Sequence, residues 1–133
     1  MPAKAETLSN ALLDHVLRNT TFTSPAAVFA ALYTVAPTAT TSGTEVVTAG
    51  GTLYDRVAVT FGAAASSSTS NTGAVTFPVA GASWGTVVAA AMTDNATVGA
   101  GNILYFGNLA DPKAVGIGDE LNFAIGALVV TES

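Results

Sequence analysis

Residues 83–92 constrain the fold of this chain more than any other stretch, because they form its longest apolar run without a charge or a proline and contain its only tryptophan. Read with the two-residue period of a β-strand, the run puts the bulky Trp84 and Met92 on one face and the smaller Val87 and Ala89 on the other. A strand that is apolar on both faces is typical of the middle of a layered β fold. The β-branched residues and the flanking turn residues favour this strand over the helix that the alanines would allow.

Composition limits the classes of protein to which the chain can belong. With 133 residues, half of them hydrophobic, it is long enough to form one domain, residues 1–133, around its own core. No apolar run reaches the ~18–20 residues of a membrane-spanning helix, and the N-terminus lacks the pattern of a secretory signal. The absence of cysteine excludes disulfides and thiolate chemistry, and a net charge of −5 argues against nucleic acid as a partner. We therefore expect no cofactor, no metal, and no contact with nucleic acid or membrane.

The N-terminal region carries the one convincing helical pattern. Its apolar residues recur at the spacing of a single helix face: Leu8, Leu12, Leu13, Val16 and Leu17. Arg18 suits the negative C-terminal end of such a helix, forms a favourable pair with Asp14, and precedes an asparagine, Asn19, suited to a left-handed exit. A helix of about three turns is too short to be stable alone in water. The stripe should therefore pack on the rest of the chain or on a neighbouring subunit, and we predict a helical arm at residues 1–20 and a β body at 27–133.

The β body is predicted from short strands about ten residues apart, separated by glycine, proline and asparagine turns. In addition to residues 83–92, the expected strands are 27–35, 45–47, 53–61, 75–79, 102–109, 121–125 and 127–131. The low-complexity residues 63–72 predict a flexible loop, and Asp111-Pro112-Lys113 predicts a turn. This spacing predicts a mainly β fold, an antiparallel β-sandwich or jelly-roll-like barrel with one short N-terminal α-helix.

No group of residues predicts catalysis. His15 is the obvious candidate for a catalytic base, but adjacent helix residues point about 100° apart, so Asp14 cannot orient it as a triad carboxylate does. No Gly-x-Ser-x-Gly nucleophile motif accompanies it. Asp119 and Glu120 would face opposite sides of a strand. We therefore expect a protein that is not an enzyme.

Ligand-binding interpretations are weak for similar reasons. Asp94, Asn95 and Asp111 could supply oxygen ligands to calcium, but their spacing matches no calcium loop, so we interpret them as turn residues. The glycine-rich residues 99–101 and 116–118 lack the further glycine or lysine of a phosphate loop. The aromatic residues could form a sugar-binding platform, although their alternation with valine and leucine favours a place in the core. They are Tyr33, Tyr54, Trp84, Tyr105 and Phe106.

Several short blocks are unspecific alone but informative in their order and spacing. They include residues 9–17, 31–34, 54–61, 75–80, 84–87 and 102–107, which read SNALLDHVL, ALYT, YDRVAVTF, VTFPVA, WGTV and NILYFG. Together they resemble a family of small tailed-phage virion proteins whose members are often labelled tail-fibre-like. The resemblance extends from about Leu8 to the end of the chain. The chain departs from the family at its insert of residues 63–72 and at the alanine-rich residues 87–91, which a neighbour would cover.

The resemblance implies a non-enzymatic structural component of a virion, made in the cytoplasm of the host bacterium. We expect a capsid decoration (cement) protein, a trimer that binds the outside of the major capsid shell, because a lone domain has no long fibre shaft. A tail-fibre or baseplate component that contacts tail proteins is the alternative, and a glycan-binding module is a third hypothesis. The expected interface comprises the helix stripe, a cation that needs a carboxylate, and the alanine-rich face. These residues are Leu12, Leu13, Val16, Leu17, Arg56, Val87 and Ala89.

Overall fold

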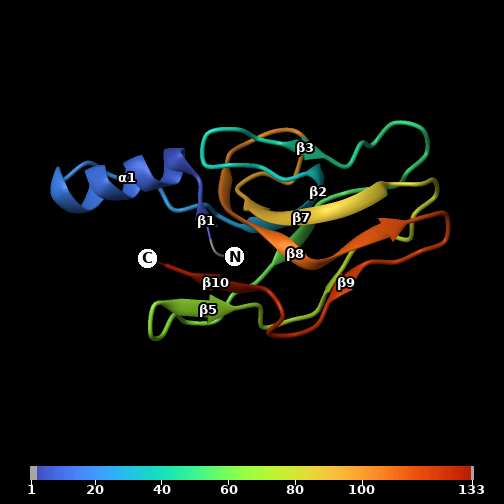
Figure 1. The fold of residues 1–133 in the computed structure, drawn as a ribbon. Coiled ribbons are helices and arrows are strands. Elements are labelled where there is room, and N and C mark those ends of the chain that lie inside the picture. The colour runs from blue at the N-terminus through green and yellow to red at the C-terminus, as the bar shows by residue number, and fades with distance from the viewer. Residues whose placement is uncertain (1–2, 133) are drawn as a thin grey trace.

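The computed structural model describes residues 3–132 and places the predicted apolar strand, β7 (Gly85–Thr93), inside a large antiparallel sheet. The sheet has the order β1-β8-β7-β2-β3, and β4 pairs with β2 (Figure 1). Its other strands are β1 (Ala3–Lys4), β2 (Val28–Val35), β3 (Thr44–Glu45), β4 (Val57–Val59) and β8 (Ile103–Val115). A strand with a partner on each side and apolar residues on both faces therefore occupies the central position that its sequence predicts.

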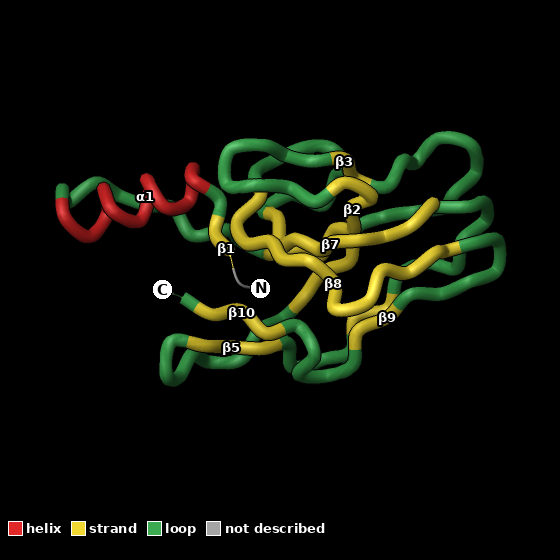
Figure 2. The backbone as a smooth tube through the Cα atoms, in the orientation of Figure 1, coloured by secondary structure: helices red, strands yellow, loops and turns green. Residues whose placement is uncertain are grey.

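Two smaller antiparallel pairs form a second layer. One consists of β5 (Ser68–Ser70) and β10 (Val129–Thr131), and the other of β6 (Val75–Thr76) and β9 (Asn122–Phe123). Figure 2 shows these pairs below the main sheet, with the single helix α1 (Glu6–Leu17) extending to one side. The prediction of a mainly β, antiparallel sandwich with one short helix is confirmed.

An aromatic cluster occupies the core between the layers. The rings of Tyr54 and Trp84 meet edge to face with centroids 5.3 Å apart, and Tyr54 stacks on Phe77 at 6.3 Å. The Trp84 Nε1–H donates to the carbonyl oxygen of Thr52 at 2.8 Å, so its only polar atom is satisfied. All three aromatic side chains are buried. The interpretation of Trp84 and Tyr54 as core residues is therefore confirmed.

The two faces of β7 differ in one respect from the predicted alternation. Val87 lies in the core with Trp84 and Met92, whereas Ala89 lies on the opposite face beside Tyr33. The cause is a shift in register against β8, where Val87 pairs with Lys113 but Ala89 pairs with Asn108. Residues 109–112 therefore bulge out of β8. The turn predicted at residues 111–113 lies within this strand and does not end it.

Two other segments depart from the sequence-based expectation. Leu53 has a positive φ of 59° and an exposed side chain, so only the second half of the strand expected at residues 53–61 forms, as β4. The flexible loop expected at 63–72 instead contains a tight hairpin, because Ala65 and Ser68 exchange both of their backbone hydrogen bonds. The second arm of this hairpin, β5, also pairs with β10. Positive φ angles at Ser66 and Ser67 are those of a type I′ turn, whose twist matches that of paired strands.

Candidate functional site

The most unusual surface of the protein is the helix α1, which projects from the sandwich in Figure 1. Of its apolar stripe only Leu8 is buried. Leu13, Val16 and Leu17 are 57%, 73% and 74% exposed, although burying each such side chain would stabilise a complex by roughly 1.5–3 kcal/mol. An amphipathic helix without cover on its apolar face is typical of a surface that binds a partner.

The first turn of α1 is attached firmly to the β body. The Ala5 N–H donates to the Leu104 carbonyl oxygen at 3.0 Å, and the Glu6 N–H donates to the Ala39 carbonyl oxygen at 2.9 Å. Just before the helix, Lys4 forms an ion pair with Glu132 near the other end of the chain. Tyr105 donates a hydrogen bond to the same carboxylate, and these two bonds lower the pKa of Glu132. The helix is therefore held at its base and leaves the body in a defined direction.

The far end of α1 is closed by local hydrogen bonds. Asp14 accepts from Arg18 at 3.2 Å within the predicted pair, and Asn19 has the predicted left-handed conformation, with φ of 55°. His15 accepts a hydrogen bond at Nδ1 from the Phe22 N–H at 3.3 Å. This bond fixes the chain where it turns back from the helix. His15 thus has an observed structural contact, and no nucleophilic side chain is among its hydrogen-bonding partners.

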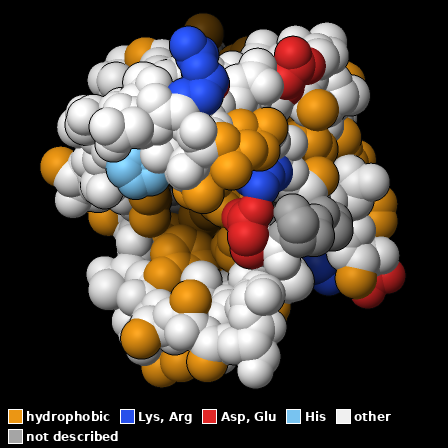
Figure 3. All heavy atoms as spheres, turned by 90° about the vertical axis from the view of Figure 1, so that its left-hand side faces the viewer, with side chains coloured by type: hydrophobic (Ala, Val, Ile, Leu, Met, Phe, Trp, Pro, Cys, Tyr) orange, Lys and Arg blue, Asp and Glu red, His pale blue; other side chains and the backbone are white. Residues whose placement is uncertain are grey.

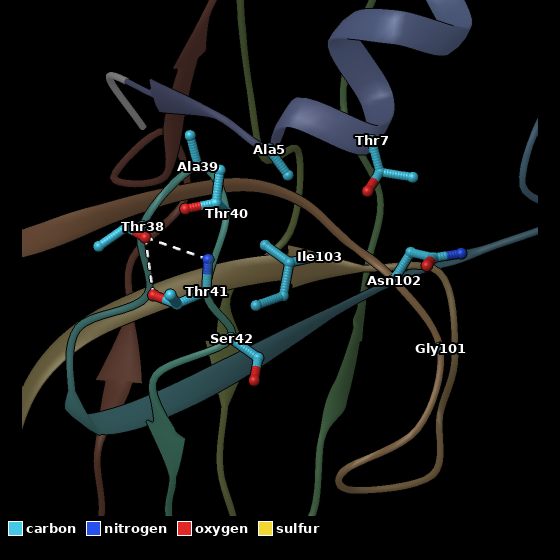
Figure 4. A pocket seen from close by; sticks show the side chains of 10 residues that line it. All are labelled: Ala5, Thr7, Thr38, Ala39, Thr40, Thr41, Ser42, Gly101, Asn102 and Ile103. Atoms are coloured by element: carbon cyan, nitrogen blue, oxygen red, sulfur yellow. Dashed lines mark hydrogen bonds between the residues drawn. The ribbon is translucent and has the colours of Figure 1, made fainter.

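A shallow cavity of about 190 Å³ lies beside the base of α1 (Figure 4). Its lining combines hydroxyl and amide side chains from α1, the loop at 38–42 and the segment before β8, and it contains no charged residue. Thr38 and Thr41 are joined by a hydroxyl–hydroxyl bond of 2.7 Å, and the Thr38 hydroxyl also accepts from the Thr41 N–H. These groups satisfy one another and brace the loop that receives the Glu6 N–H. The residues that line the cavity thus help to hold the base of the helix.

The structure separates the expected interface residues into two groups. Leu12, Leu13, Val16 and Leu17 lie on the projecting helix. Arg56, Val87 and Ala89 lie inside the protomer, with Val87 and Ala89 completely buried by the chain itself. The surface open to a partner therefore excludes these last three residues. The bulge in β8 turns Val87 into the core, and small residues opposite Tyr33 close the other face.

Arg56 finds its carboxylate within the chain. Its Nε and Nη2 donate to the two oxygens of Glu45 at 2.9 and 2.7 Å, and Nη1 donates to the carbonyl oxygens of Asn95 and Ala100 at 2.8 Å each. The Tyr54 hydroxyl donates to Glu45 at 2.7 Å. Burial, followed by the nearby charge of Glu45, raises the pKa of this tyrosine. Sequence reasoning missed Glu45, although a buried arginine is strongly destabilising when its charge is left unpaired.

The remaining polar candidates have structural roles. Asp119 accepts from the Gly116 N–H at 2.8 Å and Asp94 from the Asn102 N–H at 2.7 Å. Both carboxylates close turns, as the sequence predicted for Asp94. Within residues 3–132, no group of three or more histidine, aspartate or glutamate side chains is placed to hold a metal ion. In the same part of the chain, no helix has the length and apolar character needed to cross a bilayer.

The β-sandwich presents a helix with an uncovered apolar stripe, and the sequence blocks resemble structural proteins of tailed-phage virions. Comparison with family models confirms this class of protein. The chain belongs to the family described as podophage GP4 fiber I protein gp80, whose model matches residues 3–131. No curated protein matches the chain.

Proposed function

We propose that the chain is a non-enzymatic structural subunit of a phage virion, and that α1 is the element through which it attaches to a neighbouring virion protein. The observation that carries this proposal is the exposure of Leu13, Val16 and Leu17 on a helix whose base is fixed. A rigid arm with an uncovered apolar stripe binds through shape and apolar burial. Such binding depends little on salt, since no long-range charge attraction drives it.

Two placements in the virion are consistent with this attachment. The description of the family names a fibre, which favours a subunit of a fibre or of its attachment to the tail. The alternative is the outside of the capsid, where a decoration protein would use the same arm to bind the major capsid protein. The number of copies in each purified particle distinguishes the two placements, because a decoration protein is present in hundreds of copies and a fibre subunit in far fewer.

The test of the attachment is a single substitution at the tip of the arm. Leu17→Asp places a charge on the exposed stripe while leaving the core untouched, because Leu17 is 74% exposed. Ile117→Asp is the matched control, since Ile117 is 78% exposed and lies in the loop between β8 and β9, at the other end of the molecule (Figure 1). Quantitative mass spectrometry of purified particles should show loss of the Leu17→Asp protein and normal amounts of the control. Full occupancy by the Leu17→Asp protein would refute the proposed role of α1.

A further inference from the structure

We propose that the partner of α1 is a second copy of this chain, and that copies exchange their arms in a closed ring. In this arrangement the arm of one copy lies in an apolar hollow of the next copy. The proposal rests on the attachment role of α1 and names its partner. Figure 3 shows the hollow: hydrophobic side chains gather in a depression below the helix, on the side from which the helix projects. An apolar arm and an apolar hollow are thus the two complementary surfaces that each copy offers.

The exposed stripe has the width expected of a helix covered by a partner. At 100° per residue, Leu13, Val16 and Leu17 span an arc of about 100°, which is the usual width of a core-facing stripe. Leu8 and Leu12, on the adjoining part of the helix, are turned toward the chain's own body, because Leu8 is buried and Leu12 is half-buried. The helix therefore has one apolar sector covered by its own body and a second sector left for another molecule.

Charge favours contact at the arm over contact elsewhere between two copies. The chain has a net charge of −5, so like copies repel one another over most of their surfaces. The outer half of the arm is neutral, because its two charged residues, Asp14 and Arg18, pair with each other at 3.2 Å. Asp14 and Arg18 lie on the helix side away from the exposed stripe. The stripe itself therefore brings no unpaired charge into a contact with another copy.

The surface area that one arm can bury explains why each copy must both give an arm and receive one. A helix of 12 residues is about 18 Å long and 10 Å wide, so half of its lateral surface is roughly 280 Å². One arm in one hollow would bury about 560 Å² in total, which is less than the ~800 Å² of many crystal contacts. If each copy both gives an arm and receives one, a closed ring buries about 560 Å² per copy, or about 1,100 Å² in a dimer and about 1,700 Å² in a trimer, which exceeds the ~1,000 Å² expected of a biological interface. Because the arm and the hollow lie on one side of the molecule, the exchange can close as a dimer or trimer without forming an open filament.

Oligomeric state is the first test. The full chain should sediment as a dimer or a trimer, Leu13→Asp and Leu17→Asp should each sediment as a monomer, and Ile117→Asp should keep the assembly. Circular dichroism verifies that the variants are folded. A wild-type monomer, an open-ended polymer, or an assembly that survives both arm substitutions would overturn the proposal. A monomeric protein that still needs α1 to join particles would refute arm exchange and leave the proposed function standing.

Thiol labelling supplies a second test, because the chain has no cysteine of its own. Leu17→Cys and Ile117→Cys introduce thiols at positions of nearly equal exposure in the protomer, 74% and 78%. If another copy covers the arm, the thiol at position 17 should react about tenfold more slowly than the thiol at 117, since access limits thiol reactivity. The difference should disappear on dilution to the monomer. Equal rates at all concentrations would contradict arm exchange.

Discussion

The buried pair of Glu45 and Arg56 provides the sharpest test of the fold energetics. The two side chains are only 10% and 3% exposed, and their guanidinium and carboxylate groups meet in a bidentate arrangement. The third nitrogen, Nη1, bonds the carbonyl oxygens of Asn95 and Ala100, which lie in the loop between β7 and β8. Arg56 therefore joins two segments of the chain, because it donates to both carboxylate oxygens of Glu45 and to two backbone carbonyl oxygens, all in part-buried hydrogen bonds.

Replacing Arg56 with methionine keeps most of the side-chain volume but removes every one of these donors. Loss of one partner from a buried ion pair costs about 3–5 kcal/mol, because the other charge is left without compensation. At ~0.05–0.15 kcal/mol per residue, a domain of this size has about 7–20 kcal/mol of stability in total. The substitution should therefore lower the free energy of unfolding by a large fraction, and the melting temperature by roughly 12–20 °C.

Urea titration followed by the fluorescence of the single, buried Trp84 measures this loss directly. Lys113→Met is the matched control, since it removes an exposed cation and should change stability by less than about 0.5 kcal/mol. The double variant Glu45→Met with Arg56→Met should be at least as stable as Arg56→Met alone, because it leaves no unpaired charge. A loss below about 1 kcal/mol for Arg56→Met would show that the ion-pair reasoning is wrong.

Two other predictions follow from the tyrosines and from the β5 hairpin. Burial, and after it the charge of Glu45, raises the pKa of Tyr33 to about 12. Burial, and after it the hydrogen bond to Glu132, raises the pKa of Tyr105 to about 12. Both folded-state values exceed the ordinary 10.0, so their contribution to stability is complete below pH 10 and is lost as the pH rises toward 12. Tyrosinate absorbance should therefore appear together with unfolding, and titration near pH 10 in a folded protein would contradict this. Replacing Ser66-Ser67 with Asn-Gly, the residues that type I′ turns prefer, should raise the free energy of unfolding by about 0.5–1 kcal/mol in the same urea assay; a decrease would rule out strain at this turn.

Features with a strong local pattern could be predicted from the sequence. The doubly apolar run at 83–92 predicted the central strand β7, and helical spacing predicted α1 and its exit at Asn19. The sequence could not show what covers the helix, because an amphipathic pattern is the same whether its partner is the chain itself or another molecule. The structure answers part of this question by leaving Leu13 and Leu17 uncovered.

The features that the sequence did not predict arise from local backbone geometry and from contacts that form only on folding. Leu53 adopts a left-handed conformation that leucine rarely takes, so no residue type there indicated a break in the strand. The bulge at residues 109–112 moves Val87 into the core, and such shifts of register leave no trace in a two-residue pattern. Glu45 and Arg56 meet through folding at a separation of 11 residues, which no helical or strand period links.

The bulge in β8 also affects what happens when many copies are crowded together in an assembling particle. Within residues 3–132, only the two-residue β1 pairs with the outer side of β8, at Tyr105 and Phe106. The rest of that border would otherwise be a template on which strands of other copies could add into cross-β ribbons. This edge is a poor template because the strand is distorted before Lys113, because Pro112 has no amide hydrogen to donate, and because the lysine is charged. We therefore expect this edge of the sheet to resist the addition of strands from other copies at high density.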